Sequence, residues 1–191
     1  MIARIAEPPP RLWTKDEFYR LADLGFFQGQ KVELWEGEVV VMSPQGPLHY
    51  TRMERVRKLL ERMLGPAFLV RMQGPISLGV HSEPEPDIAV VLSDDYSHAH
   101  PHAALLIVEI CDSSLSIDRG SKASLYARHG IADYWIVNLI DDQLEVYRQP
   151  QVDPSQPYGY SFAAPTVLGR SDSVTPLALP SLVIAVDELL G

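Results

Sequence analysis

The clearest pattern in the chain is a helical repeat of apolar residues between residues 49 and 64. The apolar face carries Met53, Val56, Leu60, Met63 and Leu64. A second face carries Arg55, Lys58 and Arg62. Apolar positions spaced at about 3.6 residues are typical of an amphipathic helix with one buried face. The pattern therefore predicts a helix over this segment, ending at Gly65-Pro66.

Shorter segments predict the other elements. Thr14 and Glu17 fit a capping box, and the helix that they open would bury Phe18 and Leu21 and end at Gly25. The remaining predicted elements are a hairpin over 31–42 that turns at Glu36-Gly37, strands at 67–72 and 75–80, a helix over 118–129, a strand pair at 133–139 and 143–148, and a last helix near 186–190.

Two strongly apolar runs, residues 87–92 and 104–111, predict buried strands. One polar loop joins them, so we expect the two strands to be neighbours in a sheet. Strands and helices then share one core, which predicts a mixed α/β (α+β) fold. A length of 191 residues favours one domain over 14–191, preceded by a Pro-rich arm over 1–13.

Two carboxylates punctuate these apolar strands. Glu109 lies among Ile107, Val108 and Ile110, with no polar alternation, so both faces of its strand are expected to be buried. A buried carboxylate is costly unless a partner compensates for its lost hydration. A functional role is therefore favoured for Glu109. For Asp87, at the start of the other strand, a solvated turn residue and a functional acid are equally good interpretations.

The two acids and a nearby lysine predict a metal site. Mg²⁺ prefers carboxylate oxygens and keeps several waters, so Asp87 and Glu109 would supply two ligands if their strands are adjacent. Lys122, in the predicted helix 118–129, has the right charge to stabilise a phosphate or to orient water. Asp118 lies four residues earlier on the same helix face. Its alternative roles are to stabilise the helix dipole or to pair with Lys122.

Composition and net charge limit the classes of protein that the chain can belong to. A net charge of −9 argues against a protein that coats nucleic acid through long-range electrostatic attraction to its phosphates. A local basic groove is still compatible with this net charge. No apolar run is long enough to span a membrane, and the first residues do not look like a signal peptide, so we expect a cytoplasmic protein. The single cysteine, Cys111, is interpreted as a small buried hydrophobe.

Other polar residues have an ordinary interpretation beside a functional one. Glu33 alternates with apolar neighbours, which favours an exposed strand position. His49 is either a surface residue at a helix start or a general base or phosphate contact. Arg55, Lys58 and Arg62 would touch a DNA backbone or form a solvated face diluted by acids. The histidines of the polar loop favour a solvated loop over a zinc site.

Taken together, these segments resemble a known family. The phrases that carry the resemblance, over roughly residues 14–190, are Glu33-Leu-Trp-Glu-Gly37, Ser43-Pro44 followed by His49, Pro86-Asp87, Val108-Glu109 with Ser113-Ser114, Asp118-Arg-Gly-Ser-Lys122, Tyr126-Ala-Arg-His-Gly130 and Asp133-Tyr-Trp-Ile-Val137. Their order and spacing resemble the Uma2 family of restriction endonuclease-like proteins, within the PD-(D/E)XK nuclease superfamily.

The resemblance implies a restriction-endonuclease-like core, with a central sheet flanked by helices. It also implies hydrolysis of DNA phosphodiester bonds that depends on Mg²⁺, with Mn²⁺ as the alternative ion, and homodimers or larger homo-oligomers. It makes Asp87, Glu109 and Lys122 the catalytic set, and it makes Glu33 a supporting or metal-ligating acid.

The sequence departs from the superfamily pattern at one position. Cys111 stands two residues after Glu109, where the pattern has lysine, so Lys122 on the next helix would have to supply the ammonium. Two hypotheses follow: a metal-dependent endonuclease, or a catalytically inactive protein of the same fold that binds or regulates. A third interpretation makes the acids and the lysine a buried structural ion network.

Overall fold

A central six-stranded sheet organises the computed structural model, which describes residues 10–191. Its order is β10-β7-β6-β5-β4-β3, and only β5 and β6 run parallel. The strands are β3 (Phe68–Met72), β4 (Ile88–Leu92), β5 (Leu106–Cys111), β6 (Asp133–Asn138), β7 (Gln143–Arg148) and β10 (Thr166–Leu168). The predicted mixed sheet and the neighbouring placement of the two apolar strands are therefore confirmed.

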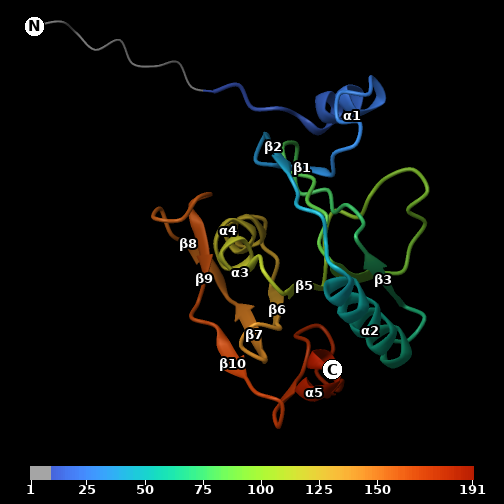
Figure 1. Cartoon of the computed structure of the whole chain (residues 1–191), viewed down its shortest axis with the longest axis vertical. Helices are drawn as coiled ribbons and strands as arrows, with labels where there is room; N and C mark the ends of the chain where they lie inside the picture. The colour runs from blue at the N-terminus through green and yellow to red at the C-terminus, as the bar shows by residue number, and fades with distance from the viewer. Residues whose placement is uncertain (1–9) are drawn as a thin grey trace, which may run out of the picture.

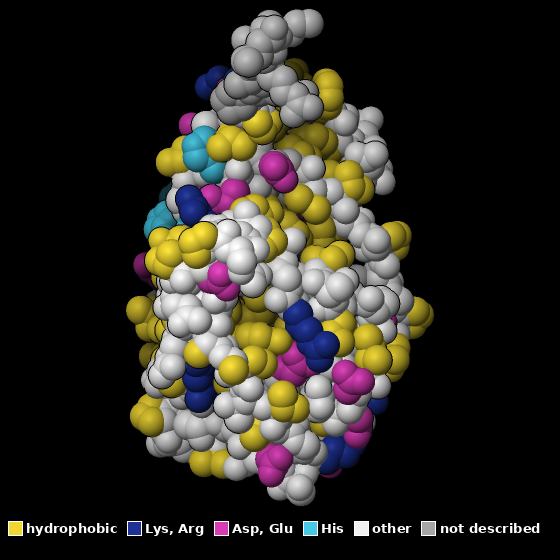
Figure 2. All heavy atoms as spheres, turned by 90° about the vertical axis from the view of Figure 1, so that its left-hand side faces the viewer, with side chains coloured by type: hydrophobic (Ala, Val, Ile, Leu, Met, Phe, Trp, Pro, Cys, Tyr) yellow, Lys and Arg dark blue, Asp and Glu magenta, His cyan; other side chains and the backbone are white. Residues whose placement is uncertain are grey.

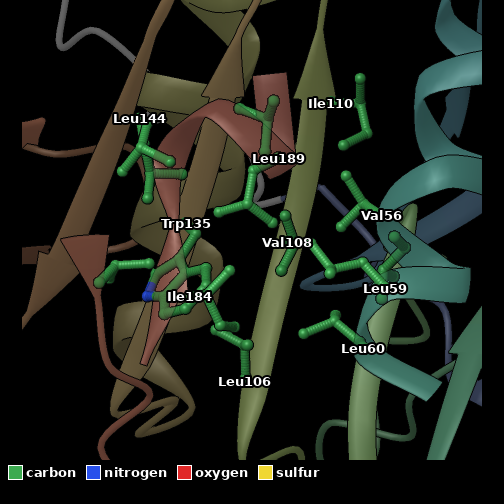
Figure 3. Packing of buried hydrophobic residues seen from close by; sticks show 14 of the residues in the cluster. Val56, Leu59, Leu60, Leu106, Val108, Ile110, Trp135, Leu144, Ile184 and Leu189 are labelled. Atoms are coloured by element: carbon green, nitrogen blue, oxygen red, sulfur yellow. The ribbon is translucent and has the colours of Figure 1, made fainter. Parts of the chain in front are cut away.

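Helices cover both faces of the sheet (Figure 1). On one face lie α2 (Pro47–Met63) and α5 (Val186–Leu190), and their apolar residues pack on those of the sheet (Figure 3). On the other face lies a continuous helical segment, formed by α3 (Leu115–Ile117), a π-helical turn (Asp118–Lys122) and α4 (Ala123–Arg128).

The strand periodicity decides which side chains meet which helix. In β5, Leu106, Val108 and Ile110 belong to the α2 side of the core, whereas Ile107 and Cys111 belong to the α4 side. Successive side chains of a strand point to opposite faces, so Glu109 points to the α4 side. An acid in this strand therefore faces the helix that carries Lys122.

Smaller elements surround this core. They are α1 (Lys15–Asp23), the pair β1 (Val32–Trp35) and β2 (Glu38–Val41), the pair β8 (Pro150–Val152) and β9 (Tyr160–Phe162), and the pair β11 (Ser173–Val174) and β12 (Ile184–Ala185). The β1–β2 turn has positive φ at Glu36 (46°) and Gly37 (83°). A Cβ at Gly37 would lie 2.5 Å from the Leu12 Cβ, so glycine is needed there both for the turn and for the close approach of the chain.

Most of the predicted elements are present, with two differences. Thr14 and Glu17 form the expected capping box of α1. Residues 75–80 form no strand, because only Leu78 makes an isolated bridge, with Ser82, across a turn at Gly79. The helix predicted over 118–129 starts three residues earlier and opens with the π-helical turn.

Two further predictions concern the chain end and membranes. Residues 1–9 of the predicted arm over 1–13 lie outside the described residues, and at its end the Trp13 N–H donates to the Gly37 carbonyl over 2.9 Å. Within residues 10–191, no helix has the length and apolar character that crossing a membrane requires.

Candidate active site

A cavity of about 680 Å³ opens beside the ends of β4 and β5. Its walls come from the β1–β2 hairpin, the loop over 43–46, the first turn of α2 and the π-helical turn. Five of the predicted site residues line it: His49, Asp87, Glu109, Asp118 and Lys122. The cavity therefore brings together residues that lie up to 73 positions apart in the sequence (122 − 49).

Asp87 and Glu109 are held side by side through the β4–β5 pairing. The Asp87 N–H donates to Glu109 Oε2 over 3.3 Å, and the Ile110 N–H donates to Asp87 Oδ2 over 2.9 Å. The Gln45 side chain donates to Asp87 Oδ1 over 3.0 Å. Both carboxylates are buried, and backbone amides fix their orientation before any ligand arrives.

Lys122 is a buried lysine rather than a solvated helix residue. Its Nζ lies 2.9 Å from Glu109 Oε1 and 3.8 Å from Asp118 Oδ1. Burial acts to lower the pKa of Lys122, but the surrounding carboxylates, with Glu109 first, outweigh burial and raise it. The ammonium is therefore charged and fixed at the floor of the cavity, as the sequence hypothesis requires.

Acidic side chains outnumber the single lysine in the cavity lining, and Glu33 lies behind them. Burial raises the pKa of Glu109 to about 8 against the attraction of Lys122, and burial also raises the pKa values of Asp118 and Glu33. Burial would raise the pKa of Asp87 too, but His49 and Lys122 beside it hold that pKa below its usual range. A divalent cation would offset the cost of burying these carboxylates together, so the chemistry of the donor set suits a metal ion.

Glu33 is buried, whereas its strand alternation favoured an exposed position. The Trp35 indole N–H donates to Glu33 Oε2 over 2.8 Å, and the charge of Lys122 acts on this carboxylate. Glu33 is absent from the cavity lining, although its neighbour Trp35 is part of it. Its position supports a role behind Lys122 more than one in direct contact with a ligand.

His49 is buried at the first turn of α2 and faces the cavity. Its Nε2 lies 3.0 Å from Asp87 Oδ2, and its Nδ1 lies 3.8 Å from Asp112 Oδ1. Burial acts to lower the pKa of His49, and the Asp87 carboxylate raises it overall. The surface position that we considered for this histidine is wrong.

Three residues that the sequence analysis did not single out also belong to the site. Tyr126 donates its hydroxyl to Glu109 Oε1 over 2.8 Å, Gln45 binds Asp87 Oδ1, and Asp112 lies beside His49. Tyr126 fits the apolar pattern of its helix, and Gln45 lies in a polar loop. Neither therefore gives the signal that marked Asp87 and Glu109, a charged residue within an apolar segment. Asp112 follows directly after β5, where a strand-end acid is a usable signal.

Neither the basic face (Arg55, Lys58 and Arg62) nor the histidine loop (residues 93–102, with His98, His100 and His102) joins the cavity. Arg55, Lys58 and Arg62 line a separate groove of about 540 Å³ with Glu54 and Glu188. Lys58 pairs with Glu54 over 3.0 Å and Arg62 with Glu188 over 3.4 Å, so acids offset much of this positive charge.

Charge is also mixed on the opposite side of the molecule. Figure 2, which views the molecule from the side of β8 and β9, shows basic side chains scattered among acidic ones.

In the histidine loop, the side chains of His98 and His102 are exposed. Residues 10–191 contain no ready-made group of three or more His, Cys, Asp or Glu side chains placed to hold a metal ion. A bound ion would therefore need water or a shift of Glu109 away from Lys122 to complete its coordination.

The fold is that of nuclease-like proteins. A solved structure titled as a putative nuclease belonging to DUF820, from Anabaena variabilis, superimposes with a TM-score of 0.67 at 20% sequence identity, covering 93% of this chain and 97% of that chain. The sequence model of Uma2, described as "Putative restriction endonuclease", matches residues 15–187. The chain therefore belongs to the Uma2 family. A search of curated proteins gives no match.

Proposed function

We propose that this protein is a metal-dependent nuclease that hydrolyses phosphodiester bonds of DNA. The observation that carries this proposal is the convergence of Asp87, Glu109 and Lys122 at the floor of one cavity. The family description points to the same chemistry. The excess of carboxylates there supports a divalent cation, Mg²⁺ or Mn²⁺, as the missing counter-charge.

Each residue has a defined task in this proposal. Asp87 and Glu109 would hold the ion, which when bound supplies an acidified water and charge stabilisation at the phosphate. Lys122 places a fixed ammonium beside Glu109, where it would stabilise charge that grows on the phosphate oxygens. Asp118 and Glu33 keep that ammonium charged and in place.

Cys111 does not replace the missing lysine. It is buried, and burial raises the pKa of its thiol to about 11, so it is neither a cation nor a thiolate nucleophile at neutral pH. The ammonium comes from the helix instead. This displacement is the main support for the alternative function, an inactive protein of nuclease fold that binds or regulates.

Cleavage assays on the purified chain test the proposal. Linear and supercoiled DNA would be incubated with Mg²⁺ or Mn²⁺ and the variants Asp87→Asn, Glu109→Gln or Lys122→Met. We expect each variant to reduce cleavage by about 10²–10³-fold. Lys122→Met alone should still bind the metal in calorimetry. Glu61→Gln and Lys31→Met are matched controls outside the cavity and should cut like the wild type.

Two outcomes would contradict the proposal. If the wild type and all variants are equally inert on DNA, while the wild type still binds a divalent cation, the inactive alternative is favoured. If neither Mg²⁺ nor Mn²⁺ binds, the metal-dependent mechanism is wrong. Contact of DNA with Arg55, Lys58 and Arg62, a cytoplasmic location and homo-oligomer formation stay predictions.

A further inference from the structure

The His49 imidazole has a buried nitrogen without a hydrogen-bond partner. Only 6% of the residue is exposed, and within residues 10–191 its Nε2 makes no hydrogen bond. Asp87 Oδ2 lies 3.0 Å away, yet the contact lacks hydrogen-bond geometry because the nitrogen is not aimed at that oxygen. A buried polar atom left in this way is costly, and because His49 lines the cavity, a ligand bound there would satisfy it.

The spacing of these two atoms matches that of two ligands of one metal ion. Donors about 2.1 Å from an ion and at right angles around it lie about 3.0 Å apart. In that arrangement each donor points about 45° away from the other, toward the ion, which is too oblique for a hydrogen bond. A shared metal ion would therefore account for both the separation and the missing hydrogen bond between His49 and Asp87.

We propose that His49 Nε2 is a direct ligand of the divalent cation, together with Asp87 Oδ2. This inference rests on the metal-dependent function proposed above and adds a nitrogen to its donor set. The Ile110 N–H fixes the Asp87 oxygen. Asp112 Oδ1 lies 3.8 Å from the other ring nitrogen of His49, beyond hydrogen-bond distance, and would have to move closer to hold the imidazole. A carboxylate behind the imidazole is the usual partner of a metal-bound histidine.

An imidazole ligand changes which ion the site prefers. Mg²⁺ favours oxygen ligands and gives up water reluctantly. Mn²⁺ and the later divalent transition metals bind imidazole more strongly. With His49 in the donor set, the site selects Mn²⁺ or a transition metal over Mg²⁺. An all-carboxylate set of Asp87 and Glu109 would lack this selectivity.

Metal binding by the full chain tests the ligand directly. Apo protein, stripped with chelator that is then removed, would be titrated with Mn²⁺ and with Mg²⁺ in calorimetry. Pulsed electron paramagnetic resonance of bound Mn²⁺ would then look for coupling to an imidazole nitrogen. We expect this coupling in the wild type, and we expect Mn²⁺ to bind at least about 10-fold more tightly than Mg²⁺.

Variants separate coordination from positioning. His49→Ala and His49→Gln should remove the nitrogen coupling and weaken Mn²⁺ binding by about 10–100-fold, with less than about 3-fold change for Mg²⁺. His98→Ala, in the exposed loop, should change neither ion. Circular dichroism would confirm that the variants are folded, and the wild-type spectrum tests the ligand even if they are not.

Different failures identify different errors. Mn²⁺ bound without nitrogen coupling, or an equal loss of Mn²⁺ and Mg²⁺ in His49→Gln, would overturn the ligand assignment. His49 would then only position Asp87, and the nuclease proposal would stand. Absence of binding by either ion in the wild type would overturn the inference together with the metal-dependent mechanism.

Discussion

Two buried glutamates in one row of the sheet have opposite electrostatic environments. Glu109 in β5 and Glu145 in β7 both pair with Ile136 of the strand between them. Both side chains are almost fully buried, although β5 is mainly apolar and β7 is half polar. Their solvent exposure is therefore equal, but Glu109 lies deeper in the protein, so the two differ in depth as well as in neighbours.

Glu145 has a full set of hydrogen-bond donors. Arg119 donates to it twice, over 2.9 and 2.6 Å, and Asn138 and Tyr147 donate over 2.7 and 2.8 Å. Burial acts to raise the pKa of Glu145, but these donors outweigh it and hold the pKa at about 2. At Glu109, burial prevails and the pKa rises to about 8. The donors around Glu145 outweigh its burial, whereas at Glu109 the ammonium of Lys122 does not.

The π-helical turn serves both glutamates. Arg119 and Lys122 belong to the same five-residue turn, and they reach Glu145 and Glu109 respectively. A π turn widens the helix and is often found at functional sites. Here it places two cations three residues apart over two strands that are not neighbours. One end of the turn anchors the helix, and the other end belongs to the candidate active site.

The largest effect that tests this comparison is expected from Glu145→Ala. It removes the acceptor for Arg119, Asn138 and Tyr147, and we expect it to lower the free energy of unfolding by about 3 kcal/mol. Urea unfolding of metal-free protein at pH 7 measures this change. Glu61→Ala, at an exposed helix pair, should change it by less than about 0.5 kcal/mol. If Glu145→Ala lowers the free energy of unfolding by less than about 1 kcal/mol, Glu145 does not form the stabilising ion pair that distinguishes it from Glu109.

A smaller effect of opposite sign is expected from Glu109→Gln. An acid whose pKa is raised by folding makes the protein less stable as pH increases from its unfolded pKa, about 4.5, to its folded value, about 8. The glutamine variant should therefore exceed metal-free wild type by about 2 kcal/mol at pH 8, with little difference at pH 4.5. Unfolding curves at several pH values measure the gap. A variant less stable than wild type at pH 8 would identify Glu109–Lys122 as a structural ion pair.

The smallest effects are expected when the tyrosine hydroxyl that donates to each glutamate is removed. Tyr126 and Tyr147 each donate over 2.8 Å, to Glu109 and to Glu145. A hydrogen bond to a charged acceptor is stronger than one to a neutral acid. We expect Tyr147→Phe to cost about 1.5 kcal/mol and Tyr126→Phe about 0.5 kcal/mol at pH 7. Equal losses in thermal unfolding would mean that Glu109 is ionised like Glu145.

The sequence predicted the parts of the site that depend on local pattern. Asp87 and Glu109 stand out because each is an acid in an apolar strand, and the short connection between their strands predicts their adjacency, which the structure confirms. Three other features are equally local: the capping box at Thr14, the turn at Glu36-Gly37 and the helix α2. Patterns of this kind need no knowledge of distant contacts.

Features that depend on distant packing were out of reach. Glu33 alternates with apolar residues as an exposed side chain would, but its partners Trp35 and Lys122 meet it only in the folded hairpin and helix. His49 becomes buried because the first turn of α2 packs against Asp87, directly before the start of β4. The π-helical turn changes the helical period over only five residues, which is too short to alter the hydrophobic pattern.

The location of the ammonium has a consequence for comparing related chains. The acids come from strands, whereas Lys122 comes from a helix that Arg119 anchors elsewhere on the sheet. Under the proposed function, metal affinity and cleavage would therefore depend on separate segments. In this family, a chain that keeps its strand acids but changes the helix would still bind ions and yet leave DNA intact. Ion binding alone is therefore an unsafe criterion for counting a relative as an enzyme.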